Sequence, residues 1–96
     1  MRSRLGLGMV STRQGNLATA RRHLLQGWLE ARRLKTPREQ ALALEFLGEA
    51  LTLMGRPQTA RRALAACRRI ATRIAPEGDL VAECGIREAL LARTMD

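Results

Sequence analysis

The sequence predicts an all-α fold built from tandem antiparallel helix pairs. Alanine, leucine and arginine, which favour helices, are abundant, while one Trp, one Phe and no Tyr leave little to support strands. Apolar residues recur with helical spacing, and part of the sequence repeats after 40 positions. Because the chain has 96 residues, we expect a single domain, 1–96, in which every helix contributes to one core.

The first two helices are expected at about 2–14 and 17–35. Gly15 follows an apolar segment, in the position where a glycine with a left-handed backbone commonly ends a helix. Asn16 comes next, and asparagine is a favoured N-cap because its side chain can accept a hydrogen bond from a free backbone N–H. Together the two residues predict a tight turn between the helices.

The other three helices are expected at about 37–54, 57–74 and 80–94. Thr36 to Glu39 has the pattern of a capping box, with proline at the first helical position. Pro57 opens the fourth helix after Gly55, and Asp79 caps the fifth. Apolar stripes with the spacing of an amphipathic helix lie on the third and fourth helices: Leu44, Leu47, Gly48, Leu51 and Met54, then Ala60, Leu64, Cys67, Ala71 and Ile74.

The internal repeat has a period of 40 residues, and eleven residues of the first unit are identical to the residue at this spacing in the second. They are Leu7, Gly8, Thr12, Gly15, Thr19, Ala20, Arg21, Arg22, Leu24, Ala31 and Arg33, each matched by the residue 40 positions later. The identities concentrate at turns and along apolar stripes, which indicates a repeated structural unit.

These residues resemble the tetratricopeptide repeat. In each unit a Leu-Gly pair precedes a turn glycine by seven residues, and Ala20 or Ala60 follows that glycine by five. The resemblance implies an α-solenoid fragment of about two and a half repeats, with repeat 1 at about 2–36, repeat 2 at about 37–76 and a terminal helix at about 79–95. The aromatic residues that the family often carries in its first helix are absent.

The units are also similar to the helical-repeat regions of bacterial transcription regulators and signalling proteins. The resemblance therefore implies a non-enzymatic module that binds a protein or peptide partner, for example as the regulatory segment of such a regulator. It also implies that the first helix of each unit lines a concave face. The inward-facing residues would be Arg2, Leu5, Met9 and Thr12 in unit one, and Leu42, Glu45, Phe46, Glu49 and Leu53 in unit two.

A face of this composition suits a helix or extended segment with apolar anchors and some positive charge, because Glu45 and Glu49 lie beside apolar groups. The alternative is that Leu42, Phe46 and Leu53 only contact neighbouring helices.

The net charge of +8 raises nucleic-acid binding as a second function. Arginine doublets on the second helix of each unit could form a stripe that contacts phosphates: Arg21 and Arg22, Arg32 and Arg33, Arg61 and Arg62, Arg68 and Arg69. The chain lacks aromatic residues to stack bases, which makes nucleic acid the less favoured partner. Arginine on an ordinary solvated surface is the simpler alternative.

The last expected helix predicts self-association. Its apolar residues spread over more than one side, and only Glu83 and Arg87 form a clear polar strip, whereas the terminal helix of a finished solenoid should be polar outside. We therefore expect a two-fold homodimer. Its contact would include Leu80, Val81, Cys84, Ile86, Leu90 and Leu91.

Neither catalysis nor a cofactor is expected. The single histidine, His23, lies between Arg22 and Leu24 and is expected on the surface, and no set of residues suggests a nucleophile with its base. Cys67 and Cys84 lack the spacing of a metal or redox motif, so we expect buried thiols. No apolar run is long enough for a membrane span and no signal-peptide pattern occurs, so we expect a cytoplasmic location without membrane contact.

Overall fold

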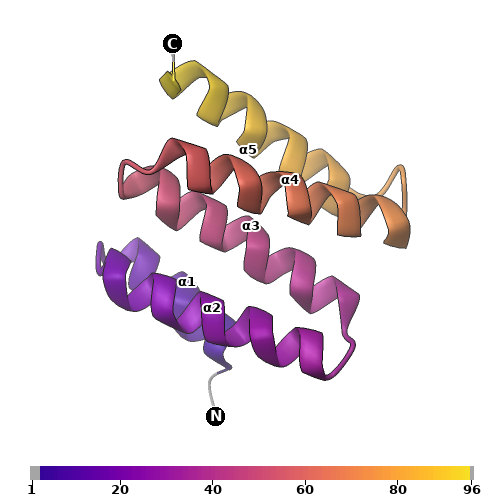
Figure 1. Cartoon of the computed structure of the whole chain (residues 1–96), viewed down its shortest axis with the longest axis horizontal. Helices are drawn as coiled ribbons and strands as arrows, with labels where there is room; N and C mark the ends of the chain where they lie inside the picture. Colours follow the sequence, from indigo (N-terminus) through magenta and orange to yellow (C-terminus); the bar gives the residue numbers. More distant parts are fainter. Residues whose placement is uncertain (1–2, 96) are drawn as a thin grey trace.

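The computed structural model describes residues 3–95, which form five helices (Figure 1). They are α1 (Arg4–Arg13), α2 (Leu17–Arg33), α3 (Pro37–Leu53), α4 (Pro57–Ile74) and α5 (Asp79–Met95). Each helix packs against the next one in the chain, and α3 also contacts α1 and α5. The predicted all-α fold of five sequentially packed antiparallel helices is confirmed.

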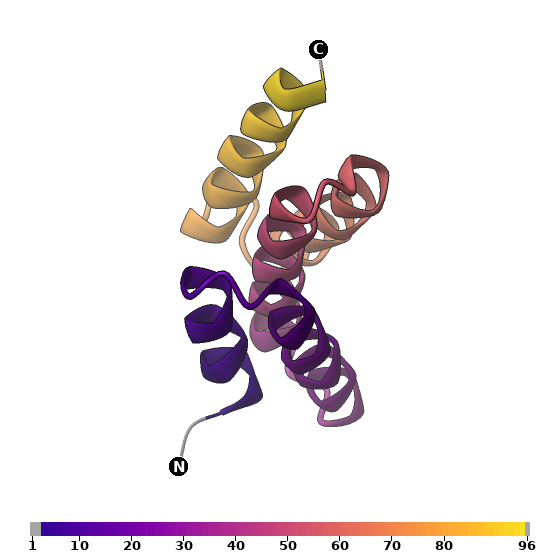
Figure 2. The same cartoon turned by 90° about the vertical axis from the view of Figure 1, so that its left-hand side faces the viewer.

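The helices lie on two sides of the molecule. In Figure 2, α1 and α5 lie on one side of α3, whereas α2 and α4 lie on the other. The result is a flat stack with extents of 39 × 33 × 17 Å. α1 and α5 therefore flank one face of the molecule, α3 lies recessed between them, and α2 and α4 form the opposite face.

Three of the turns between helices have the same backbone structure. Gly15, Lys35 and Gly55 have positive φ angles of 80°, 55° and 75°, and each follows the C-cap of its helix. In each turn the next residue donates its N–H to a carbonyl five residues earlier, at 2.9–3.0 Å. This is the Schellman motif, which glycine favours because it has no Cβ. Lys35 was not expected in this role, and it ends α2 at Arg33 rather than at 35.

The expected N-caps are wrong in three places. Asp79 is the first residue of α5 rather than the residue before it. Neither Asn16 nor Thr36 makes a side-chain capping hydrogen bond. The Thr36 hydroxyl instead donates to the carbonyl oxygen of Ala31, because the turn brings the end of α2 within its reach. Ser3 is the observed side-chain cap: its hydroxyl accepts from the N–H of Gly6, and α1 begins at Arg4 rather than at 2.

The helix crossings depend on glycine. A Cβ on Gly8 would lie 2.5 Å from Leu24 Cγ, and one on Gly48 would lie 2.6 Å from Leu64 Cδ2. Leu24 and Leu64 are fully buried, as are Ala20 and Ala60 on the same helices. Because any larger residue would meet a packed leucine, each pair of helices approaches closely only where its first helix carries glycine.

A threonine lies four positions after each of these glycines, and both threonines make the same hydrogen bond. Thr12 donates its hydroxyl hydrogen to the carbonyl oxygen of Gly8 at 2.8 Å, and Thr52 donates to Gly48 at 2.7 Å. Thr12 is buried, so the expectation that it faces a partner is wrong. Its hydroxyl is used within α1 because a buried hydroxyl needs a hydrogen-bond partner.

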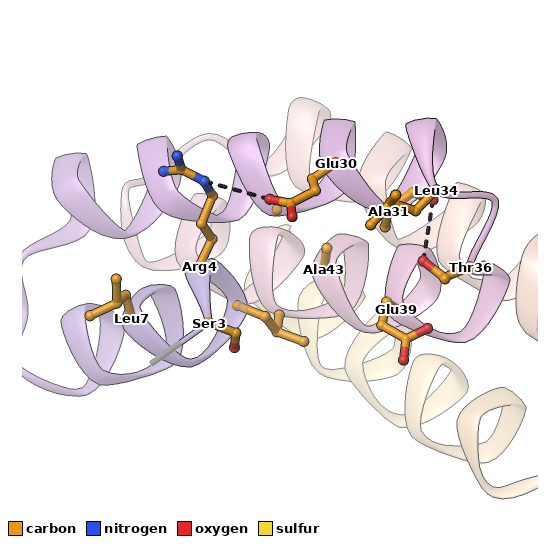
Figure 3. A pocket seen from close by; sticks show the side chains of 11 residues that line it. Ser3, Arg4, Leu7, Glu30, Ala31, Leu34, Thr36, Glu39 and Ala43 are labelled. Carbon is orange, nitrogen blue, oxygen red and sulfur yellow. Dashed lines mark hydrogen bonds and ion pairs between the residues drawn. The ribbon is translucent and has the colours of Figure 1, made fainter. Parts of the chain in front are cut away.

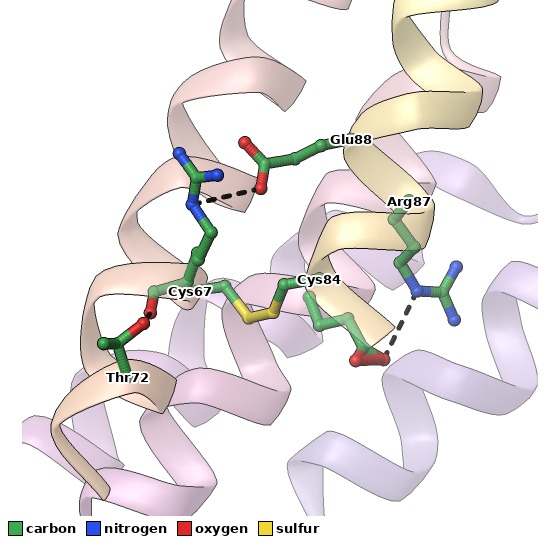
Figure 4. The surroundings of a disulfide bond; sticks show 7 residues. Cys67, Thr72, Cys84, Arg87 and Glu88 are labelled. Atoms are coloured by element: carbon green, nitrogen blue, oxygen red, sulfur yellow. Dashed lines mark hydrogen bonds and ion pairs between the residues drawn. A yellow bond between two sulfur atoms is a disulfide. The ribbon is translucent and has the colours of Figure 1, made fainter. Parts of the chain in front are cut away.

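Cys67 and Cys84 form a disulfide between α4 and α5 (Figure 4). Both side chains are buried, as expected, but the prediction that they are thiols is wrong. The sequence shows only two cysteines 17 positions apart, and it is the return of α5 along α4 that brings them together. None of the described helices is both long and apolar enough to cross a membrane.

Candidate protein-binding surface

The face made by α1, α3 and α5 contains the residues expected to contact a partner, apart from Arg2, which lies outside the described residues. Leu53 is exposed, with 59% of its surface accessible. Leu5, Leu42 and Phe46 are half-buried and pack against the core, so they serve partly as contacts between helices. Met9 and Glu49 are half-buried as well.

Glu45 does not face a partner. It is 1% exposed, and its carboxylate pairs with the guanidinium of Arg87 on α5 at 3.3 Å. Arg87 also donates to Glu49 and lies over the ring of Phe46, 5.6 Å from the ring centre. The expectation that Glu45 binds positive charge from a partner is therefore wrong, because α5 supplies that charge from within the chain.

The Glu45 carboxyl gains or loses its proton near neutral pH. Its burial, and after it the hydrogen bond to Glu83, raise the pKa of Glu45 to about 7 despite the opposing charge of Arg87. One oxygen, Oε1, has no hydrogen-bond donor among the described residues, which suits a protonated carboxyl that can itself donate to Glu83. The contact between α3 and α5 is therefore sensitive to pH.

An open groove of about 810 Å³ lies beside the start of α1 (Figure 3). At this place the end of α2 and the beginning of α3 extend past the described residues of α1. Its lining residues come from all three helices: Ser3, Arg4, Leu5, Leu7, Gly27, Glu30, Ala31, Leu34, Thr36, Glu39 and Ala43.

The groove combines apolar surface with charge at its edges. Leu34 is 54% exposed beside small residues such as Ala31 and Ala43. Arg4 and Glu30 form an ion pair at 3.7 Å on one edge of the groove, whereas Glu39 is exposed and makes no ion pair within the described part of the chain. A ligand with apolar side chains and one positive charge would therefore be complementary to the groove.

A smaller hollow of about 140 Å³ lies at the other end of the same face, where α5 diverges from α3. Leu53 and Leu90 are its exposed apolar residues, at 59% and 55% exposure. Buried Leu64 and Leu91 lie beneath them. The α1–α3–α5 face thus carries apolar surface at both ends.

Of the residues expected to mediate self-association, some are buried in the core and others are exposed. Leu80, Cys84 and Leu91 belong to the core, at 6%, 0% and 3% exposure, and so cannot reach a second copy. Val81 is half-buried against the same core. Ile86 and Leu90 are exposed. The apolar pattern of α5 was too broad to show which stripe faces α4, and the disulfide determines it.

The arginine doublets lie on α2 and α4, and all eight side chains are exposed. Arg68 pairs with Glu88 of α5 at 3.4 Å, and Arg32 lies over the ring of Trp28 at 4.9 Å. The remaining six make no ion pairs with the described residues. This distribution fits both alternatives considered for them, a solvated surface and a phosphate-binding stripe.

His23 is half-buried rather than fully on the surface. Within residues 3–95 no three His, Cys, Asp or Glu side chains are grouped as metal ligands would be. Sequence reasoning missed Arg87 as the centre of the α3–α5 contact, although a single arginine between apolar positions of α5 was a usable signal. The groove beside α1 could not be predicted from the sequence. Its shape depends on where helices end, and a shift of one helical turn would change it.

Comparisons of the chain with models of known protein families, with curated proteins and with solved structures find no match. Its class follows from the fold alone: an all-helical domain of five sequentially packed helices with one open face.

Proposed function

We propose that the chain is a tetratricopeptide-like helical repeat that binds a protein or peptide through the α1–α3–α5 face and catalyses no reaction. Three contacts that recur 40 residues apart support the repeat: Gly8 on Leu24 and Gly48 on Leu64, the hydrogen bonds of Thr12 and Thr52, and the turns at Gly15 and Gly55. Helix pairs with such shared contacts stack into solenoids that expose one continuous face for binding.

The groove beside α1 is the observation that carries the proposed function. Apolar pockets with a few charged groups at their edges are the usual form of binding sites. The occupant we propose is an amphipathic helix, since peptide-binding grooves commonly take the apolar face of such a helix. Its apolar side chains would contact Ala31 and Leu34, and a basic residue would pair with Glu39.

Affinity capture with matched variants tests this proposal. Leu34→Glu places a charge in the groove, whereas Arg69→Glu changes an exposed charge on the opposite face. A partner should be retained by the wild-type chain and by the Arg69 variant and lost with the Leu34 variant. Equal capture by all three chains would exclude the groove as the binding site.

Nucleic acid is the alternative partner, favoured by the exposed arginine doublets of α2 and α4, of which only Arg68 makes an ion pair with the described residues. Removing Arg61, Arg62, Arg68 and Arg69 together should leave stability within about 1 kcal/mol, because exposed charges contribute little. Salt-dependent binding of random duplex DNA that is lost in this variant would support the alternative. If the variant failed to fold, the exposed placement of these arginines would be wrong.

The disulfide bears on the proposed cytoplasmic location. Disulfides persist in oxidising compartments and are rare in the cytosol. Lysis in acid, followed by unfolding, alkylation and mass spectrometry, measures the state of the pair in cells, and two alkylated cysteines would support a cytoplasmic location. An oxidised pair in cells lysed under acid conditions would place the protein in another compartment.

A further inference from the structure

The exposed side of α5 carries a strip with the spacing of a coiled-coil seam. Asp79, Glu83, Ile86, Leu90 and Arg93 follow one another at alternating intervals of four and three residues, and all five are exposed. This alternation keeps residues on one side of a helix and is the pattern by which two helices pack side by side. Ile86 and Leu90, at its centre, are 61% and 55% exposed.

The rest of the chain leaves most of this strip uncovered; only the carboxyl of Glu83, which is otherwise exposed, reaches back to Glu45 of α3. α5 contacts only α3 and α4 among the described helices, and it lies at the outer edge of the stack (Figure 1). Its opposite side is held to α4 by Leu80, Leu91 and the Cys67–Cys84 disulfide. The helix is therefore fixed in place while its seam faces outward.

The order of charges along the strip indicates which molecule it binds. Its beginning is acidic, with Asp79 and Glu83, and its end is basic, with Arg93. We infer that the strip binds the same strip of a second copy of this chain in antiparallel orientation about a two-fold axis. Ile86 of each copy then faces Leu90 of the other, and Glu83 faces Arg93. A parallel pairing would place like charges opposite each other, which disfavours it.

The inferred contact is self-complementary, as a two-fold interface must be, because each pairing occurs twice. It is also small. Interfaces below about 1,200 Å² belong to weak and transient complexes, so the dimer should dissociate on dilution, with a dissociation constant on the order of 10–100 µM. The inference goes beyond the proposed function, and it uses α5 rather than the groove beside α1, so either can fail without the other.

Charge-reversal variants test the pairing of Glu83 with Arg93, and analytical ultracentrifugation measures how strongly each variant dimerises. Arg93→Glu should weaken the dimer about tenfold or more, because the new carboxylate would then face Glu83 of the other copy. Glu83→Arg should do the same, and the double reversal E83R/R93E should restore the wild-type dimer because it exchanges the two charges. Arg73→Glu, an exposed charge on α4, is the control and should change nothing. Circular dichroism shows that each variant is folded.

Three outcomes would overturn the inference. The wild-type chain could remain monomeric at high micromolar concentration, which would mean that the strip does not bind a second copy. Arg93→Glu could leave the dimer unchanged, as expected for a parallel pairing in which this position faces itself. The double reversal could fail to recover association, which would show that Glu83 and Arg93 do not face each other.

Discussion

At the scale of single residues, the glycines at the helix crossings matter most. A Cβ at Gly48 would lie within 2.7 Å of two carbon atoms of Leu64, which is itself 1% exposed and has little room to move. Gly48→Leu should therefore lower the free energy of unfolding by about 2–4 kcal/mol, because bulk is forced into a close-packed crossing. Ala60→Leu should have a similar effect, since Ala60 is fully buried on the partner helix.

Gly85 provides the matched control. It lies in the interior of α5, and a Cβ there would meet nothing within 4 Å. Gly85→Ala should raise stability by about 0.5–1 kcal/mol, because alanine favours the helix and no neighbour is displaced. Urea unfolding measures both variants. A Gly48 variant as stable as the wild type would show that the helices do not cross at this residue.

The Glu45 carboxyl makes stability depend on pH. In the folded chain its pKa is raised to about 7, by burial first and by Glu83 second, from an ordinary value of 4.5. The native state therefore keeps a proton that the unfolded state releases, and this contribution is complete below pH 4.5 and is lost as pH rises through 7. Relative to Glu45→Gln, the wild type should lose about 1–3 kcal/mol between about pH 5 and pH 8.

Urea unfolding of both proteins across this range measures the difference. Glutamine is the suitable replacement because it keeps the size of the side chain and cannot ionise. Stability curves that stay parallel would mean that Glu45 titrates normally, and hence that it is hydrated rather than buried between α3 and α5.

At the scale of helices, α5 depends most on a single bond. The Cys67–Cys84 disulfide closes a loop across a sequence separation of 17, and a loop of this length predicts about 3 kcal/mol of stabilisation. Reduction should remove this amount, and the loss should appear first in α5, because α1 to α4 pack on one another without it. Hydrogen exchange with and without reductant measures the effect for each helix. Uniform loss of protection in all five helices would contradict it.

Helix positions could largely be predicted from the sequence because their signals are local. Gly15 and Gly55 end helices through a backbone conformation that favours glycine, and Pro37 and Pro57 begin them. Lys35 adopts the same conformation as the two glycines without any such signal. Its turn is imposed by the packing of α2 on α3, which no local pattern contains.

At the scale of the whole molecule, prediction was limited by contacts between distant residues. The sequence indicated that Glu45 and Arg87 were polar positions in α3 and α5, but their ion pair depends on how closely these helices approach. Leu80, Cys84 and Leu91 were apolar positions for which the pattern left two possible neighbours, and α4 covers them. The groove beside α1 depends on the residues at which helices begin and end, and sequence patterns do not predict these ends to within one or two residues.

The central claim is that this groove binds a protein partner, and amide chemical shifts in NMR test it most directly. A peptide selected against the immobilised chain from a displayed random library is titrated into the isotope-labelled protein. We expect saturable shifts clustered at the groove, at Gly27, Ala31, Leu34, Glu39 and Ala43. Shifts confined to the arginines of α2 and α4, or no saturable shifts with any selected peptide, would contradict it.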